Sequence, residues 1–269
     1  MTHSPTELRA LLDRHGLAAR RALGQNFVVD PNTVRRIAEL SGAGPGDPVV
    51  EIGPGLGSLT LALLEVGASV TAVEMDSELV PILQEVVAGR DVSIVEADAQ
   101  HVDWDDVLSA HPSWKLVANL PYNVATPLVL DLLRDVPQIT EMLVMVQLEV
   151  AERLAATAPD PAIGIPSVLV AYHGTASIAA RVPPTVFHPR PRVDSAVVRI
   201  VRHATPPITA PLDRLESLVR AGYGQRRKMI RKSLAGLLSS EQIERAGVDP
   251  QARPETLDLD GWGRLALIN

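Results

Sequence analysis

The chain has 269 residues, a formal net charge of −7 and 46% hydrophobic residues, enough for a full core in one large domain or two. It contains no cysteine, which excludes disulfides and thiolate metal sites. No apolar run approaches the roughly 18 residues that span a bilayer, and the first residues lack a basic-then-apolar secretory pattern. We therefore expect a cytoplasmic protein with no membrane partner.

Charge is distributed unevenly along the chain. Residues 37–180 contain 4 Lys and Arg against 20 Asp and Glu, whereas residues 181–232 contain 12 against 3 and residues 1–36 contain 6 against 3. Such segregation creates local fields that the net charge hides. We expect the basic segments to bind a polyanion although the whole chain is acidic.

The first predicted element is a helix over 6–14 that Gly16 ends. An irregular segment over 19–27 follows, and it carries Arg20, Arg21 and an aromatic side chain. Asp30 and Pro31 then match the N-cap and first position of a helix that runs to about Leu40.

Apolar runs alternate with helical segments from residue 47 to residue 147. This alternation predicts a mainly parallel sheet with right-handed crossovers. The expected strands cover 49–52, 69–73, 92–95, 115–118 and 142–146, and the expected helices cover 59–65, 77–88, 103–109 and 126–133.

Three glycines, Gly53, Gly55 and Gly57, break the chain directly after the first of these strands. Glycine adopts torsions that a side chain forbids and lets a ligand approach the main chain, and the next helix would point free N–H groups at that ligand. The spacing G-x-G-x-G, preceded by Glu51, departs from the G-x-G-x-x-G of dinucleotide enzymes. It predicts a nucleotide-like ligand that need not be NAD; a plain structural turn is the alternative.

Polar residues follow three further strands where each strand ends. Glu74 comes about 20 residues after the first glycine, where doubly wound nucleotide-binding folds place an acid on ribose hydroxyls. Asp98 and Asn119 follow the next two strands. Because open α/β sheets bind ligands at the carboxyl ends of their strands, we expect these side chains to share one site. A solvated loop end is the alternative for each acid taken alone.

The segment Asn119-Leu120-Pro121-Tyr122 combines an amide, a rigid proline and an aromatic ring. The Asn119 side-chain oxygen and a backbone carbonyl, that of Leu120, suit the two protons of an exocyclic amino group, while Tyr122 stacks on the base. Such acceptors stabilise the positive charge that develops as the nitrogen attacks an electrophile. An ordinary turn is the alternative.

The rest of the chain predicts a second, helical domain. A helix over 149–156, a turn at 159–161, strands over 177–182 and 195–201, and a stiff proline-dense link over the carboxyl edge of the sheet at 183–192 come first. We place the boundary near 203–210, which gives a domain over 1–205 and a helical domain over 206–269. Its expected helices cover 212–221, 226–238, 241–246 and 260–267.

The two phenylalanines, Phe27 and Phe187, both fall in predicted loops. Rings on loops near a glycine turn suit stacking on an extruded base; packing of each loop onto the core is the alternative.

The basic run over 226–232 contains no acid. On a helix, Arg227 with Arg231 and Lys228 with Lys232 would be like-charge i,i+4 pairs that a bound phosphate relieves, and a solvated helical face is the alternative. The seven histidines form no metal-binding or nucleophile motif, so we expect no metal.

Five motifs occur in order, and two tail segments at 247–250 and 253–257 accompany them. The motifs are LGQNF at 23–27, EIGPGLG at 51–57, NLPY at 119–122, FHPRPRVDSAV at 187–197 and QRRK at 225–228. Over nearly the whole chain they resemble the ribosomal RNA adenine dimethyltransferases, and most of all the small-subunit group. The resemblance implies an α/β, Rossmann-like S-adenosyl-L-methionine-dependent methyltransferase domain with a small α-helical carboxyl-terminal domain that binds rRNA.

The implied reaction is dimethylation of N6 of two adjacent adenosines near the 3′ end of 16S rRNA, in the 30S ribosomal subunit or its precursor, with a role in small-subunit biogenesis. The implied residues fall into three groups. S-adenosylmethionine would contact Asn26, Val28, Gly53, Gly55, Glu74, Asp98 and Asn119. The target adenine would contact Asn119, Leu120, Pro121, Tyr122 and Phe187, and RNA would contact Arg20, Arg21, Arg190, Arg192, Arg226, Arg227, Lys228 and Arg231.

The chain departs from the family at two places. Val28 stands where leucine is more frequent, and prolines and alanines after Pro159 replace basic and aromatic residues. Three alternatives stay open: the related 23S rRNA methyltransferase of macrolide resistance, an assembly factor whose binding matters more than its catalysis, and an NAD oxidoreductase. We expect a monomer, because no heptad or extra interface helix occurs.

Overall fold

The computed structural model describes residues 2–20 and 24–268, so Arg21, predicted to bind RNA, lies outside the described residues. In chain order the elements are α1 (Pro5–Arg14), β1 (Phe27–Val28), α2 (Pro31–Leu40), β2 (Pro48–Ile52), α3 (Ser58–Glu65), β3 (Ser69–Glu74), α4 (Val80–Val86), β4 (Val92–Glu96), α5 (Trp104–Val107), β5 (Trp114–Asn119), α6 (Ala125–Asp135), β6 (Ile139–Gln147), α7 (Leu148–Ala155), α8 (Ile165–His173), β7 (Gly174–Val182), the 3-10 turn η2 (Pro184–Val186), β8 (Phe187–His188), β9 (Ser195–Arg202), α9 (Leu212–Gly224), α10 (Ile230–Ser233), α11 (Ser240–Arg245), the 3-10 turn η3 (Pro254–Thr256) and α12 (Leu259–Ala266).

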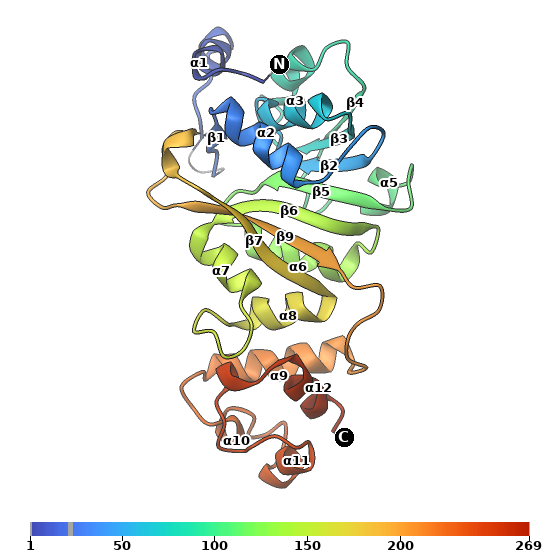
Figure 1. The fold of residues 1–269 in the computed structure, drawn as a ribbon, viewed down its shortest axis with the longest axis vertical. Coiled ribbons are helices and arrows are strands. Elements are labelled where there is room, and N and C mark those ends of the chain that lie inside the picture. Colours follow the sequence, from blue (N-terminus) through green and yellow to red (C-terminus); the bar gives the residue numbers. More distant parts are fainter. Residues whose placement is uncertain (1, 21–23, 269) are drawn as a thin grey trace. The chain divides into compact units, whose positions relative to one another are not determined.

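The main sheet has seven strands in the order β4-β3-β2-β5-β6-β9-β7 (Figure 1). Strands β2 to β6 pair in parallel, as predicted, and β9 runs antiparallel to β6. The chain leaves β2 on one side for β3 and β4 and returns to the other side as β5. The carboxyl ends of β2 and β5 therefore flank a topological switch point, where open α/β sheets bind their ligands.

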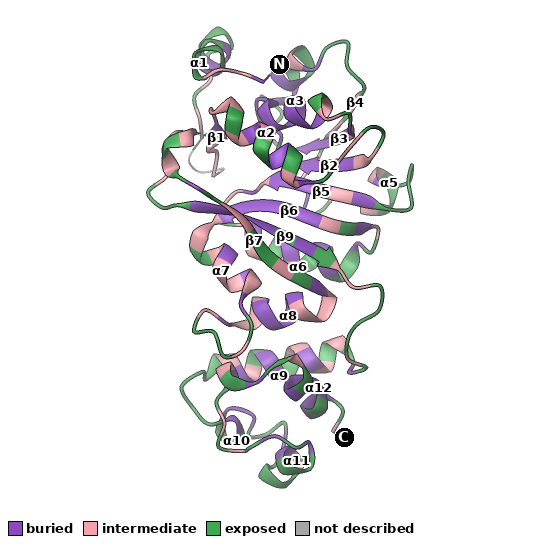
Figure 2. Cartoon of the chain, viewed as in Figure 1, coloured by how far each residue is buried: buried purple, intermediate pink, exposed green. Residues whose placement is uncertain are grey.

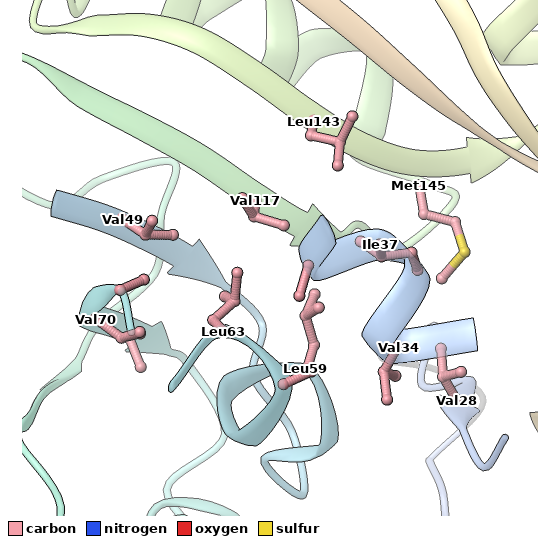
Figure 3. Packing of buried hydrophobic residues seen from close by; sticks show 14 of the residues in the cluster. Val28, Val34, Ile37, Val49, Leu59, Leu63, Val70, Val117, Leu143 and Met145 are labelled. Atoms are coloured by element: carbon pink, nitrogen blue, oxygen red, sulfur yellow. The ribbon is translucent and has the colours of Figure 1, made fainter. Parts of the chain in front are cut away.

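Helices α2 and α3 pack their apolar side chains against one face of this sheet. Asp30 caps α2 by accepting a hydrogen bond from the Thr33 N–H at 2.9 Å, as its sequence position predicts. Figure 3 shows side chains of both helices against those of the strands, and Figure 2 shows the central strands buried along most of their length. Burying this apolar surface fixes where both helices begin, and α3 begins at the switch point.

Helix α1 packs its three leucines, Leu8, Leu11 and Leu12, onto Leu56 of the glycine turn and Leu79 before α4. The Ser4 and Glu7 side chains close a capping box at its start. The amino-terminal arm is thus fixed beside the glycine turn by apolar burial.

The chain divides into two compact units. The first comprises 1–151 with 177–201, and the second comprises 152–176 with 202–269. The division near residue 202 lies close to the predicted boundary, but the second unit also takes in 152–176. That segment contains α8, a helix missing from the sequence prediction although Pro166 marks its first turn. Its Val168 belongs to the core of the second unit.

Trp262 of α12 is the fully buried centre of the second unit's core. Its ring stacks on Tyr223 with centroids 6.0 Å apart. A β-carbon at Gly222 would lie 2.5 Å from the Trp262 Cη2, so α9 and α12 approach each other at a position where only glycine fits.

The predicted helix over 226–238 is wrong. Residues 225–228 form a turn, and α10 covers only Ile230–Ser233. The Ile230 and Arg231 N–H groups donate instead to the carbonyls of Ala252 (2.7 Å) and Pro250 (3.1 Å). Because these bonds to a distant segment replace helical ones, the expected i,i+4 charge pairs do not form.

Over residues 2–20 and 24–268, no helix combines the length and apolar character needed to cross a bilayer.

Candidate active site

A cavity of about 210 Å³ opens at the carboxyl ends of β2, β3 and β5. Its wall includes all seven residues predicted to bind the cofactor, namely Asn26, Val28, Gly53, Gly55, Glu74, Asp98 and Asn119. Leu120, Pro121 and Tyr122 line the same cavity. The structure thus brings together residues that lie almost one hundred positions apart in the sequence.

The glycine turn needs its glycines. Gly53, Gly55 and Gly57 have φ angles of 68°, 56° and 78°, which side chains disfavour. A β-carbon at Gly55 would also lie 3.0 Å from the Phe27 ring. Helix α3 then begins without a side-chain cap, so the N–H groups of its first turn are left for a ligand.

Two buried acids, Glu74 and Asp76, lie at the carboxyl end of β3, where Glu74 is its last residue. Glu74 accepts hydrogen bonds from the N–H groups of Gly55 (3.0 Å) and Asp76 (2.9 Å), and burial raises the pKa of its carboxyl above the usual range. Asp76 accepts from the Gln25 side chain at 2.7 Å, which ties the amino-terminal arm to this acid. The sequence analysis predicted no role for Asp76. Its position two residues after Glu74 was a signal that it also lines the site.

Glu51 is a further acid of the wall that the sequence prediction left without a role. Its side chain is on β2, only 1% exposed, and its polar partner is the Thr60 hydroxyl, which donates to Oε2 at 2.6 Å. Burial raises the pKa of Glu51 to about 8, with a smaller contribution from Glu74 and an opposing one from Thr60. Near neutral pH this carboxyl therefore holds its proton most of the time.

Asp98 lies at the end of β4 and is more accessible. Its carboxylate accepts a hydrogen bond from the Gln100 N–H at 2.9 Å and lies 2.8 Å from the His101 Nδ1. The Gln100 N–H, with a smaller contribution from His101, keeps the pKa of Asp98 below its usual range. Asp98 is therefore ionised at neutral pH and can accept from an amino group.

Asn119 presents a free acceptor to the cavity. Its Nδ2 donates to the Asn26 carbonyl at 3.0 Å, which turns Oδ1 away from that contact. Across residues 2–20 and 24–268, nothing donates to Asn119 Oδ1 or to the Leu120 carbonyl. Two neighbouring acceptors are the number needed by the two protons of an exocyclic amino group.

The residues on either side hold this segment in place. The Tyr122 hydroxyl lies 2.8 Å from the buried Ser195 Oγ on β9, which holds the ring at the cavity. Gly24 lies so close to Pro121 that a β-carbon there would be 3.0 Å from the proline Cβ. The turn is thus packed between the amino-terminal arm and β9.

The expectation that Phe27 and Phe187 occupy loops is wrong. They lie in the two short strands β1 and β8, which pair with each other in the register Val28 to Phe187. Phe27 lines the cavity, whereas Phe187 is 4% exposed and packs among core residues such as Val182 and Val197. Backbone pairing between distant segments orders the proline-dense link, and it places Phe187 in the core outside the cavity lining.

The residues predicted to bind RNA differ in their surroundings. Arg20 forms ion pairs with Glu78 and, at 3.5 Å, with Asp76, so acids beside the cavity already neutralise it. Arg226 donates to the Pro161 carbonyl at 2.8 Å and faces Glu255. The remaining described members are exposed: Arg190 and Arg192 between β8 and β9, and Arg227, Lys228 and Arg231 in the second unit.

The wall chemistry fits a nucleoside ligand that carries hydroxyl and amino groups. Its acidic members are Glu51, Glu74, Asp76 and Asp98, and no Lys, Arg or His belongs to the described lining. The Ser58 hydroxyl, also in the wall, is buried without a hydrogen-bond partner in the described chain. Nowhere in the described ranges do three His, Cys, Asp or Glu side chains gather as metal ligands. Sheet order and the glycine turn together define a Rossmann-like nucleotide-binding domain.

Comparison with known proteins identifies the family. The family model described as ribosomal RNA adenine dimethylase matches residues 16–267, and the chain belongs to this family. It is 48% identical to the ribosomal RNA small subunit methyltransferase A of Nocardia farcinica, over 97% of this chain and 94% of that protein. The protein of the same name in Kineococcus radiotolerans is 45% identical, over 98% and 90%.

Solved structures show the same fold. The 23S rRNA methyltransferase ErmE is 29% identical with a TM-score of 0.71, and the match covers 89% of this chain and 98% of that one. A dimethyladenosine transferase from Plasmodium falciparum has a TM-score of 0.74 at 22% identity, over 88% and 94%. The Rossmann-like prediction is therefore confirmed.

Proposed function

We propose that the chain dimethylates N6 of two adjacent adenosines near the 3′ end of 16S rRNA, in the 30S subunit or its precursor, with S-adenosylmethionine as methyl donor. The observation that carries this proposal is the pair of free acceptors, Asn119 Oδ1 and the Leu120 carbonyl, beside the glycine-turn cavity. The names of relatives at 45–48% identity support the small-subunit substrate. The smaller identity to ErmE, 29%, makes 23S rRNA the second candidate.

S-adenosylmethionine, when bound, supplies a methyl group on a positively charged sulfur. We assign Glu74 to the ribose hydroxyls and Asp98 to the adenine amino group, because both carboxylates line the cavity at strand ends. Asn26, Val28, Gly53 and Gly55 complete the cofactor side. The free N–H groups of α3 and the orphaned Ser58 hydroxyl offer donors to the carboxylate end.

The adenine side of the site acts by positioning and charge. Asn119 and Leu120 accept from the amino group and stabilise the positive charge that grows on its nitrogen, so no basic side chain is required. Pro121 makes the turn rigid, and Tyr122, held by Ser195, offers its ring for stacking. We keep Phe187 as a residue of the adenine pocket that acts through β8, where it pairs with Val28 of the cavity wall.

RNA binding is assigned to exposed basic side chains. In the first unit these are Arg190 and Arg192, and in the second unit they are Arg227, Lys228 and Arg231. Salt-dependent contacts to phosphates follow from their exposure. We further propose a cytoplasmic monomer, with a role in small-subunit biogenesis that follows from its substrate.

Labelled S-adenosylmethionine tests the proposal with separate samples of unmethylated 30S subunits, 50S subunits and naked 16S rRNA. We expect label in N6,N6-dimethyladenosine of the 30S particle, mapped to two adjacent positions near the 3′ end of 16S rRNA. Label confined to large-subunit rRNA would favour the 23S activity. Binding to 30S subunits without any label would favour an assembly factor.

A further inference from the structure

Glu51 lies in the cavity wall but has no part in the roles assigned above. Its neighbours across the sheet, Ala72 on β3 and Val117 on β5, are apolar, and its polar partner on α3 is the Thr60 hydroxyl. Glu74 is the charged group that acts on it. Within the described residues, Glu51 is therefore a carboxyl in an apolar setting, and one hydroxyl donor and one neighbouring acid act on its charge.

The wall as a whole carries unbalanced negative charge. Arg20 pairs with Asp76, and His101 lies against Asp98. No Lys, Arg or His of the described chain pairs with Glu51 or Glu74. A cationic ligand would supply the missing positive charge, because an opposite charge nearby favours ionisation of a buried carboxyl.

The proposed methyl donor and its product differ by one such charge. S-adenosylmethionine carries a sulfonium, whereas S-adenosylhomocysteine carries a neutral thioether in the same framework. We infer that Glu51 distinguishes the two: it is ionised when the cationic donor occupies the cavity and protonated when the neutral product does. The inference rests on the proposed function, since it takes S-adenosylmethionine as the ligand.

Glu51 is better suited to this role than Glu74. Two main-chain N–H groups hold the charge of Glu74, and the ribose that we assign to it is common to donor and product. Glu51 has one hydroxyl donor, and burial raises its pKa to about 8, which puts the change of charge within one or two units of neutral pH. The donor should therefore displace a proton from Glu51, and the product should not.

Isothermal titration calorimetry at about pH 6.5, 7.5 and 8.5 tests this, with wild type and Glu51→Gln in two buffers of different ionisation enthalpy. The ligands are S-adenosylmethionine, S-adenosylhomocysteine and sinefungin, which carries an ammonium in place of the sulfonium centre. The α-amino group of each ligand also titrates near this range. The sulfonium charge itself shifts the pKa of that group, and Glu51→Gln retains this contribution of the ligand, so the difference between wild type and variant isolates Glu51.

For wild type we expect the affinity ratio of donor to product to rise by up to about tenfold from pH 6.5 to pH 8.5, as a lowering of one pKa unit gives. Sinefungin should follow the donor, and both should release a fraction of a proton at pH 7.5 that the product does not. Glu51→Gln should remove this rise and leave only the contribution of the ligands' own α-amino groups. Thr60→Val, which removes the hydroxyl that favours ionised Glu51, should move the rise to higher pH.

Thermal unfolding without any ligand tests the protonation of Glu51 independently. Folded wild type holds a proton on Glu51 that the unfolded chain loses above about pH 4.5, so its stability falls as pH rises toward 8. The melting temperature of Glu51→Gln minus that of wild type should therefore increase over that pH range. A difference that stays constant with pH would overturn the inference.

Equal proton counts for the three ligands on wild type, or the same pH dependence of the ratio in wild type and Glu51→Gln, would also overturn it while leaving the proposed function intact. Failure of all three ligands to bind wild type would overturn the proposed function and the inference together.

Discussion

Asn119 combines two bonding roles at the end of β5, and each uses a different atom of its amide. Nδ2 donates to the Asn26 carbonyl, and this bond leaves Oδ1 available to the target amino group. Asn119→Ala should therefore lower the single-turnover methylation rate by about 100-fold to 1,000-fold, the scale of removing one preorganised polar group from a site. Rapid-quench assays on unmethylated 30S subunits measure that rate.

Asn32→Ala is the matched control for this prediction. It removes the same side chain from the exposed surface of α2 in the same unit and should leave the rate unchanged. Binding of the Asn119 variant to 30S subunits should also be unchanged, because Asn119 lies in the cavity and outside the basic segments. A variant that retains full methylation would contradict the assignment of Asn119.

Sequence reasoning predicted the location of residues that stand at strand ends. Glu74, Asp98 and Asn119 were predicted to share one site because parallel strands bring their carboxyl ends to one edge, and they do line one cavity. Glu51 precedes the first glycine in the sequence, yet its burial and its bond to Thr60 depend on how α3 packs on β2. Local sequence carries no measure of that burial.

At the scale of whole elements, the contact between α9 and α12 depends on one missing side chain. A β-carbon at Gly222 would lie 2.5 Å from the buried Trp262 ring. Gly222→Ala should therefore destabilise the second unit by about 1–3 kcal/mol through overpacking. This outweighs the gain of about 1 kcal/mol that alanine brings to a helix interior. Urea unfolding followed by tryptophan fluorescence measures the change.

Gly224→Ala in the same helix separates the two effects. A β-carbon at Gly224 would have no neighbour within 4 Å, so this variant gains helix propensity without a clash. Its stability should be unchanged or higher by at most about 1 kcal/mol. Equal destabilisation of both variants would show that the Trp262 contact is not the cause.

Elements were predictable where their signals are local. Helix α2 begins where Asp30 and Pro31 place it, because an N-cap satisfies N–H groups only three residues away. The helix expected over 226–238 failed because its backbone N–H groups bond to residues 250 and 252 instead. Strands β1 and β8 were missed for the same reason, since each is two residues long and exists only through pairing with the other.

At the scale of the whole molecule, the charge segregation along the sequence corresponds to an acidic cavity in the first unit and to exposed basic side chains in both units. The acids of the first unit include the four that line the cavity. In the second unit, the turn before α10 exposes Arg227 and Lys228. Arg226 belongs to the same run, but its bonds to Pro161 and Glu255 give it a structural role within the unit. In this basic run, Arg226 is therefore bonded to other residues of the unit, whereas Arg227 and Lys228 are exposed.

This division predicts which charges bind RNA. Replacing Arg227 and Lys228 together with glutamine should weaken binding to 30S subunits and lower the slope of log affinity against log salt by about 1 for each phosphate that is no longer neutralised. Arg245→Gln, which removes an exposed charge from α11 of the same unit, should leave that slope unchanged. Filter binding at several salt concentrations measures both.

Two outcomes would contradict the assignment of RNA binding to Arg227 and Lys228. An equal decrease of slope in the double variant and in Arg245→Gln would mean that RNA responds to the total charge of the unit and not to this turn. An unchanged slope in both would place RNA binding on the remaining basic residues, of which Arg190 and Arg192 lie in the first unit. Neither substitution touches the cavity, so the affinity for S-adenosylmethionine should stay constant throughout. RNA binding and cofactor binding would then depend on different residues.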